Sequence, residues 1–354
     1  MTTLLYAGIA VLVGGGYYLL FSNKKENNQL DDDECMTEGT DEEIIVNNDL
    51  IQQKKTNTRM FLFPSLFTDH RIFSNQKKVY GDILQVIDLF ELDEKVYGKV
   101  DELTLHSYAK QLTAYIVKNY EKEILDKDFE QFFVGGFCVG GMISIFVAQE
   151  LMKGYPEIAK KLKGVMLVGS CPSFTHCVDP RYLKIKKVVM NYFPRFVLNG
   201  IVRFYLWANR YLNKISSLME SNMVSVWKED RNIMLKYKTV LDDMMLDKDP
   251  NFVFQMLIAE FNFTAHDLDN TLKKDEQVEW DRFNNDLPIS HLHGDNDYLL
   301  RSNLCESFVK QQVLPNKGNY RLRVMKHSGH FLPLTRMNAV TNFIYNIIQG
   351  SPVL

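Results

Sequence analysis

Several common signals of binding and catalysis are missing from this 354-residue sequence. Its formal net charge is −3 at pH 7, so there is no basic excess that would favour a nucleic-acid partner. No dinucleotide fingerprint, phosphate-binding P-loop or paired Cys-x-x-Cys motif occurs, and we therefore predict neither a cofactor nor a metal site. The five cysteines are odd in number and irregularly spaced, which suits a reducing compartment.

The N-terminus carries an apolar run without a charge. Residues 4–21 are 18 uncharged positions, just enough for a membrane-spanning helix. No positive residue precedes the run, no small-residue cleavage site follows it, and Lys24 and Lys25 come directly after. We predict a single-pass anchor over residues 1–22 with the remaining chain on the cytoplasmic side, because basic residues tend to stay there. A cleaved signal peptide is the alternative.

An acidic, polar stretch runs from residue 23 to residue 58. It contains acidic clusters at residues 31–34 and 41–43 and few large apolar residues, which predicts a disordered linker. The hydrophobic composition of 46% is sufficient for one large core. We therefore expect a single folded domain over residues 59–350.

Short apolar runs alternate with helical patterns along that domain. The runs typical of strands are residues 60–64, 83–90, 130–134, 164–169, 287–294 and 320–325. The last of them alternates apolar and charged residues, as a strand at the side of a sheet does. Helical patterns cover residues 105–124, 142–151 and 334–348. This alternation predicts an α/β fold, with a mostly parallel, doubly wound sheet covered by helices on both faces.

The pattern changes between about residues 179 and 279. This stretch is long, helical, and rich in aromatic residues and methionine. A helical cap inserted here would cover the sheet edge and build an apolar pocket. Ordinary packing between helices is the alternative reading for most of these aromatic side chains.

A tight turn bounded by glycines follows the strand run at 130–134. Gly136 and Gly140 lie two residues on either side of Cys138, and a helical pattern begins directly afterwards. Small flanking residues are needed where a strained turn presents a nucleophile between a strand and a helix. The positive N-terminal end of the helix would favour the Cys138 thiolate. We predict that Cys138 is a nucleophile; an inert buried cysteine is the alternative.

Two later loops offer an acid and a base. Asp297 follows a strand run, and we predict that it accepts a hydrogen bond from the base and fixes its tautomer. Asp295 is its competitor, and both are also typical turn residues. His330, between a glycine and a phenylalanine after the last strand run, is the predicted base, with His327 as competitor.

Together these segments resemble the α/β-hydrolase superfamily. The box Gly136-Phe137-Cys138-Val139-Gly140-Gly141 is similar to those of dienelactone hydrolases and polyhydroxyalkanoate synthases, which use cysteine natively. The overall layout looks more like a group of uncharacterised bacterial α/β-hydrolases that carry serine at this place. The likeness is carried by residues 63–73, 249–252, 291–297 and 329–331. It implies an α/β-hydrolase fold with a cap and a triad of Cys138, Asp297 and His330.

The resemblance also implies two backbone donors for an oxyanion, the N–H groups of Leu66 and Val139. The sequence departs from the family beside the first, because Ser65 and Phe67 stand where glycines usually turn the backbone. Losing one such donor typically costs on the order of a hundredfold or more in rate. The departure bears on catalytic strength and not on fold.

These features predict a membrane-tethered hydrolase facing the cytoplasm. Its substrate would be a small hydrophobic ester, thioester or lactone, cleaved through an acyl-cysteine intermediate. One alternative is an acyltransferase that passes the same acyl group to an alcohol or thiol. The other is a binding module of the same fold without catalysis. The sequence identifies no protein partner.

Overall fold

A computed structural model describes most of the predicted domain. It covers residues 46–54, 56–65, 68–89, 104–178, 277–297 and 300–351, with scattered positions between 180 and 267. The predicted anchor at residues 1–22, most of the acidic linker and most of the cap at 179–279 lie outside the described residues. No helix in the described part is long and apolar enough to cross a membrane.

The described strands form one six-stranded parallel sheet in the order β2-β1-β3-β4-β5-β6. They are β1 (Thr58–Phe63), β2 (Leu84–Val86), β3 (Gln131–Phe137), β4 (Leu162–Val168), β5 (Ile289–Gly294) and β6 (Tyr320–Met325). The predicted parallel sheet is confirmed, with β6 at its side as its alternating sequence indicated. Because every pair is parallel, the carboxyl ends of all six strands meet at one edge.

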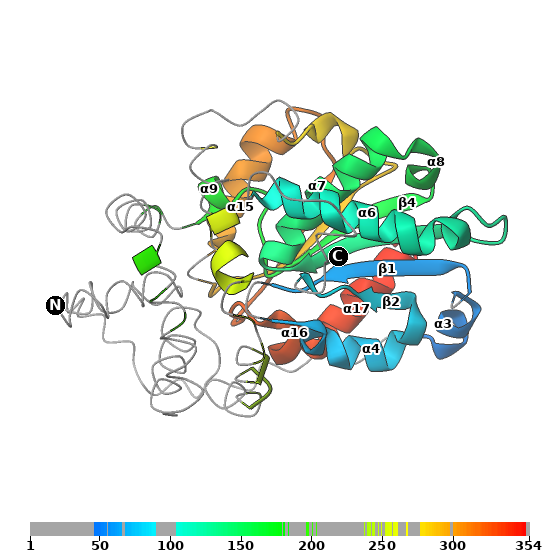
Figure 1. The fold of residues 1–354 in the computed structure, drawn as a ribbon, viewed down its shortest axis with the longest axis horizontal. Coiled ribbons are helices and arrows are strands. Elements are labelled where there is room, and N and C mark those ends of the chain that lie inside the picture. Colours follow the sequence, from blue (N-terminus) through cyan, green and yellow to red (C-terminus); the bar gives the residue numbers. More distant parts are fainter. Residues whose placement is uncertain are drawn as a thin grey trace.

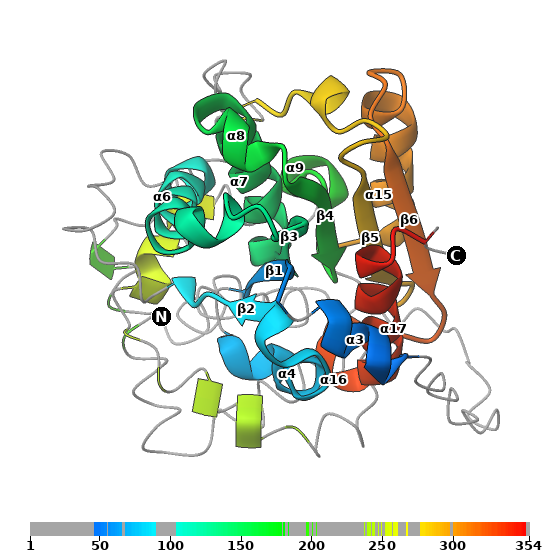
Figure 2. The ribbon, with the colours of Figure 1, turned by 90° about the vertical axis from the view of Figure 1, so that its right-hand side faces the viewer.

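Helices cover both faces of this sheet (Figures 1 and 2). On one face lie α6 (Leu105–Ile124), α7 (Val139–Gly154), α8 (Pro156–Ala159), α9 (Phe174–Cys177) and α15 (Ser302–Phe308). On the other lie α3 (Asn48–Lys54), α4 (Ser74–Tyr80), α16 (Leu332–Thr335) and α17 (Met337–Ile348). Short helical turns complete the described elements: η1 (His70–Phe73), η2 (Gly81–Ile83), η5 (Trp280–Arg282) and η6 (Val309–Val313).

The core is divided by the sheet into two apolar layers. Along β1, Phe61 and Phe63 pack into the layer beneath α6 and α7, whereas Met60 and Leu62 pack into the layer beneath α4 and α17. This alternation follows from the two-residue period of a strand. Both faces of β1 are buried, so its sequence is apolar nearly throughout, as expected for a central strand of a parallel sheet.

Two predicted boundaries are wrong. The linker was expected to extend to residue 58, but Asn48–Lys54 form α3, because Ile51 is only 3% exposed and packs into the layer beneath α4 and α17. The single terminal helix predicted over 334–348 is interrupted at Arg336, whose backbone is not helical (φ −132°, ψ 50°). The Arg336 guanidinium instead donates to the Ser328 hydroxyl at 2.9 Å and the His327 carbonyl at 2.8 Å.

Candidate active site

Cys138 occupies the turn between β3 and α7 in a strained conformation. Its φ of 53° and ψ of −121° are uncommon for a residue with a side chain. A Cβ atom added at Gly136 or Gly140 would collide with the Phe63 carbonyl oxygen at the end of β1. Glycine is therefore required at both flanking positions by the close approach of the neighbouring strand.

The backbone of Cys138 is held from β4. Its N–H donates to the Val168 carbonyl at 3.1 Å, and its carbonyl accepts from the Ser170 hydroxyl at 2.5 Å. Sequence reasoning missed Ser170, which follows β4 and has no motif of its own. Val139 begins α7, where backbone N–H groups have no partner within the helix. The other predicted oxyanion donor, Leu66, lies outside the described residues.

His330 and Asp297 form a buried pair next to this turn. His330 Nδ1 lies 2.6 Å from Asp297 Oδ2, and the two side chains are almost completely shielded from solvent. Burial alone would raise the pKa of the Asp297 carboxyl. The charge of His330 and the hydrogen bond with it reverse that effect and lower this pKa, with a smaller contribution from the Leu300 N–H.

His330 also interacts with Cys138. Burial alone would lower the pKa of the His330 imidazole, but the charges of Asp297 and Cys138, and the hydrogen bonds with both side chains, raise it well above its usual range. The structure therefore brings the three predicted residues together in the order thiol, imidazole, carboxylate. This arrangement favours the imidazolium form of His330.

The two competitors from the sequence lie outside this arrangement. Asp295 accepts a hydrogen bond from the Ser328 N–H at 3.2 Å, so it fixes the loop that leads to His330. His327 has a φ of 53° and an exposed side chain, and its carbonyl accepts from Arg336. Neither makes a described contact with the His330 ring.

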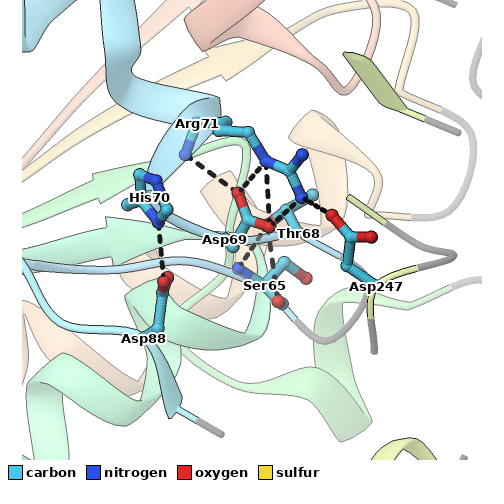
Figure 3. Close-up of polar contacts among 7 residues, drawn as sticks. All are labelled: Ser65, Thr68, Asp69, His70, Arg71, Asp88 and Asp247. Carbon is cyan, nitrogen blue, oxygen red and sulfur yellow. Dashed lines mark hydrogen bonds and ion pairs between the residues drawn. The ribbon is translucent and has the colours of Figure 1, made fainter. Parts of the chain in front are cut away.

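The loop after β1 is tied together by polar contacts (Figure 3). The Ser65 N–H donates to the Thr68 hydroxyl at 2.8 Å, and the Thr68 N–H donates to the Ser65 carbonyl at 3.1 Å. Asp69 accepts from the Arg71 N–H at 3.0 Å and thereby caps the N-terminus of η1. The turn that differs from the family pattern is thus closed at Ser65 and Thr68.

Figure 3 also shows two charged groups that the sequence did not reveal. The Arg71 guanidinium contacts Asp69 at 2.6 Å and Asp247, within the predicted cap segment, at 2.7 Å. The hydrogen bond with Asp69 outweighs partial burial and raises the pKa of the Arg71 guanidinium further. In addition, His70 Nδ1 lies 2.8 Å from Asp88 Oδ2.

Strand order places Cys138 where a ligand would be expected. The chain runs from β1 outward to β2 and returns to the other side of β1 as β3, so the order reverses between β1 and β3. In open α/β sheets, ligands bind outside the carboxyl ends of the strands at such a reversal. The loop after β1 and the Cys138 turn after β3 border this position.

The other described cysteines differ from Cys138 in exposure. Cys171, Cys177 and Cys305 are free and buried, whereas Cys138 is partly exposed. Burial is the largest contribution that raises the pKa of the Cys171 thiol. Within the described ranges, no group of three or more His, Cys, Asp or Glu side chains is arranged to hold a metal ion.

Comparison by sequence finds no matching family model and no matching curated protein. Comparison by structure finds many related folds. A thermophilic esterase from Thermogutta terrifontis is 15% identical, with 84% of this chain and 92% of that chain covered and a TM-score of 0.50. A lipase-esterase related protein from Clostridium acetobutylicum is 18% identical, covering 83% and 96%, with a TM-score of 0.50.

A third similar structure is a 2-hydroxy-6-oxo-6-phenylhexa-2,4-dienoate hydrolase from a Rhodococcus species. It is 12% identical, covers 83% of this chain and 91% of its own, and has a TM-score of 0.52. These neighbours and the parallel sheet give the chain the α/β-hydrolase fold. At such low identity the likeness extends to the fold alone.

Proposed function

We propose that this protein is a hydrolase that cleaves a small hydrophobic ester, thioester or lactone through an acyl-cysteine intermediate. The observation that carries the proposal is the buried Asp297–His330 pair, joined at 2.6 Å and hydrogen-bonded to Cys138 in its strained turn. A thiol, an imidazole and a carboxylate in this order are the parts that nucleophilic acyl transfer requires.

Acylation begins with the Cys138 thiolate and the His330 imidazolium. The sulfur attacks the carbonyl carbon of the substrate, and a C–S bond forms as the carbonyl electrons move to its oxygen. The Val139 N–H, at the start of α7, donates to that oxyanion. When the tetrahedral intermediate collapses, the bond to the leaving alcohol or thiol breaks, and His330 gives the leaving group its proton.

Deacylation reverses the roles. Neutral His330 removes a proton from a water molecule, and the water oxygen attacks the acyl carbon. The C–S bond then breaks, the carboxylic acid leaves, and Cys138 returns as thiolate beside the imidazolium. Throughout, Asp297 stays ionised and accepts from His330 Nδ1, which keeps Nε2 available for the moving proton.

The preference for a hydrophobic acyl group rests on the surroundings of His330. The Phe137 and Phe331 rings lie 5.0 and 5.5 Å from the imidazole, measured between ring centroids. The cap predicted over residues 179–279 is rich in aromatic side chains and methionine. An apolar wall of this kind favours an apolar substrate and strengthens the charge interactions of the triad.

The proposed hydrolase is tethered to a membrane through residues 4–21 and faces the cytoplasm. Support comes from the uncharged run itself and from Lys24 and Lys25 directly after it. The test is fractionation of cells that express the full chain, compared with a chain that begins at residue 23. Recovery of the full chain in the soluble fraction would refute the tether and leave the chemistry untouched.

The chemistry is tested by trapping the acyl enzyme. The full chain is mixed with p-nitrophenyl butyrate, quenched in acid and digested, and the peptide with Cys138 is expected to gain the mass of a butyryl group. Cys138→Ala should show neither this adduct nor turnover. In the unaltered chain, iodoacetamide should label Cys138 ahead of the buried Cys171, Cys177 and Cys305. Butyrylation of another residue, or undiminished turnover by Cys138→Ala, would overturn the proposal. Added alcohol that intercepts most of the acyl group would identify a transferase instead.

A further inference from the structure

A chain of buried hydrogen bonds lies behind Asp297. The Tyr320 hydroxyl is 2.8 Å from His291 Nδ1, and His291 Nε2 is 3.2 Å from His293 Nδ1. His293 Nε2 in turn lies 2.6 Å from the Leu300 carbonyl oxygen. All four residues are buried, and none of them belongs to the triad. The chain connects the β6 side of the sheet to the loop that carries the predicted acid.

The acceptor at the end of the chain fixes the direction of the bond from His293, and a neutral His293 ring then fixes the direction of the other two bonds. A carbonyl oxygen only accepts, so His293 Nε2 carries a proton. With His293 neutral, its Nδ1 accepts, and His291 Nε2 must donate to it. His291 Nδ1 then accepts from the Tyr320 hydroxyl. Burial lowers the pKa of His291 well below its usual range, despite a bond with the Ser170 backbone, in agreement with a neutral ring.

Leu300 transmits this anchoring to Asp297. Its carbonyl is held by His293, while its N–H donates to Asp297 Oδ1 at 3.0 Å. The other carboxylate oxygen, Oδ2, accepts from His330. His293 Nε2 is itself 3.9 Å from Oδ2, too long for a hydrogen bond. Each oxygen of Asp297 thus has its own donor, and the orientation of the carboxylate depends on where Leu300 is held.

We propose that His293 is a positioning residue for the Asp297–His330 pair, held in its tautomer by His291 and Tyr320. The inference rests on the proposed function, because it concerns the acid of the same triad. The chain does not relay protons to Asp297, since it ends on a carbonyl oxygen that does not take up a proton. Its effect is to hold the Leu300 backbone and, through it, the carboxylate that orients His330.

Other titratable groups face this chain from neighbouring elements. They are Cys177 of α9, Cys305 of α15 and Cys171 in the segment after β4. The Asp297 carboxylate faces it from the loop after β5, with His330 beyond. A change of activity with pH therefore counts as an effect of His293 only if the tautomer of the His293 ring, measured in parallel, changes over the same pH range.

The first test uses the unaltered full chain. Nitrogen chemical shifts of ¹⁵N-histidine report which ring nitrogen carries the proton. We expect His293 and His291 to remain neutral with the proton on Nε2 across the pH range of activity. A His293 ring protonated on Nδ1, or on both nitrogens, would overturn the proposal, because the donors and acceptors of the chain would then be reversed.

The second test compares two substitutions of similar chemistry. In His293→Gln, the amide nitrogen can reach the position of Nε2 and still donate to Leu300, whereas the shorter amide in His293→Asn reaches only the position of Nδ1. We expect His293→Asn to lower kcat by up to about a hundredfold with little change in KM, as for a misplaced catalytic group. Glutamine should restore most of the loss. Tyr320→Phe removes only the last hydroxyl of the chain, and we expect a loss of a few fold. His70→Gln is the control: it changes an exposed histidine outside the proposed triad and should leave activity unchanged.

Two further readouts separate positioning from general damage. If Asp297 is displaced, the pKa of His330 falls, so the alkaline limit of activity should move to lower pH in His293→Asn and not in His293→Gln. The downfield proton signal of His330 Nδ1–H should weaken in the same variant. Equal activity of the asparagine and glutamine variants, or an unchanged His330 signal in a folded, slow variant, would refute the inference. If Cys138 forms no acyl adduct in the unaltered chain, the proposed function fails, whereas the tautomer measurement still decides the direction of the chain.

Discussion

The molecule contains two histidine–aspartate pairs at the same edge of its sheet, and they differ mainly in solvent exposure. His330 Nδ1 and Asp297 Oδ2 are 2.6 Å apart, and their side chains are 4% and 0% exposed. His70 Nδ1 and Asp88 Oδ2 are 2.8 Å apart, but the His70 side chain is 64% exposed. In both pairs the aspartate follows a strand and is buried. A short contact between Nδ1 and a carboxylate therefore occurs both at the predicted base and at an exposed histidine.

The two pairs also differ in the surroundings of the part of each imidazole that does not contact the aspartate. Water surrounds most of His70 and screens its interaction with Asp88. His330 is shielded from solvent and meets the Cys138 side chain, so the charges of Asp297 and Cys138 act on it at low dielectric. In the proposed mechanism, desolvation and the neighbouring Cys138 side chain distinguish the buried pair from the exposed histidine.

Removal of the histidine should separate the two pairs most clearly. We expect His330→Ala to lower kcat/KM on the order of 10⁵-fold, as loss of a triad base does. His70→Ala should change it by no more than about twofold, because the His70 side chain is exposed and makes no described contact with Cys138 or His330. The measurement is hydrolysis of p-nitrophenyl butyrate by both variants of the full chain. A comparable loss in both would place the two pairs in one site and contradict the contrast.

Replacement of the carboxylates should give the next largest difference. Asp297→Asn keeps the shape of the side chain but removes the charge that fixes the His330 tautomer, and we expect kcat to fall on the order of 10⁴-fold. The matched variant Asp88→Asn should retain nearly full activity. Rates at several pH values distinguish the loss of a tautomer from a simple shift of the optimum. An active Asp297→Asn enzyme would leave Asp297 as a structural residue only.

The buried pair should also make stability depend on pH. The pKa of His330 is raised in the folded chain, so its contribution to stability is complete below the unfolded pKa near 6.5 and is lost as pH rises through the folded value. The pKa of Asp297 is lowered, so its contribution is present above about 3.8 and is lost as pH falls further. The Tm difference between the unaltered chain and His330→Gln should therefore be largest near pH 5 and shrink at alkaline pH.

The control for this measurement is His70→Gln. Its Tm difference from the unaltered chain should stay small throughout, because the His70 side chain is exposed and its interaction with Asp88 is screened by water and salt. If the His330→Gln difference grows with pH instead, the buried imidazole is neutral in the folded protein. The thiolate–imidazolium starting state of the proposed reaction would then be wrong.

Each of the three predicted site residues can be recognised from the residues next to it in the sequence. Cys138 lies in a glycine-bounded turn, and Asp297 and His330 each follow a strand in the chain order of the superfamily. Parallel strands bring such loops to one edge, so the order along the chain translates into proximity. For this reason the strands and the proximity of the three residues could be predicted from the sequence. The order of the strands in the sheet could not, because no run of residues specifies it.

The features that sequence reasoning missed depend on contacts between distant segments. Arg71 and Asp247 are 176 positions apart, and nothing in either segment marks the other as its partner. His291 and His293 do alternate on one strand, which places both on one face. The hydrogen-bonded chain also needs Tyr320 of β6, which reaches His291 because β6 pairs with β5. The sequence does not specify that pairing. Likewise, α3 is specified by the burial of Ile51 and not by its polar surroundings.

The smallest expected effect concerns the exposed cluster around Arg71. The bond between Arg71 and Asp69 lies within one loop, and the Asp69 carboxylate is nearly buried, whereas the Asp247 side chain is 64% exposed. Asp247→Ala should therefore reduce stability by less than about 1 kcal/mol, and high salt should remove the difference. Asp69→Ala should cost more, because it also removes the acceptor of the Arg71 N–H at the start of η1. Urea unfolding of both variants at low and high salt measures these differences. A large, salt-insensitive loss in Asp247→Ala would mean that this contact, like the Asp297–His330 pair, is shielded from water in the folded protein.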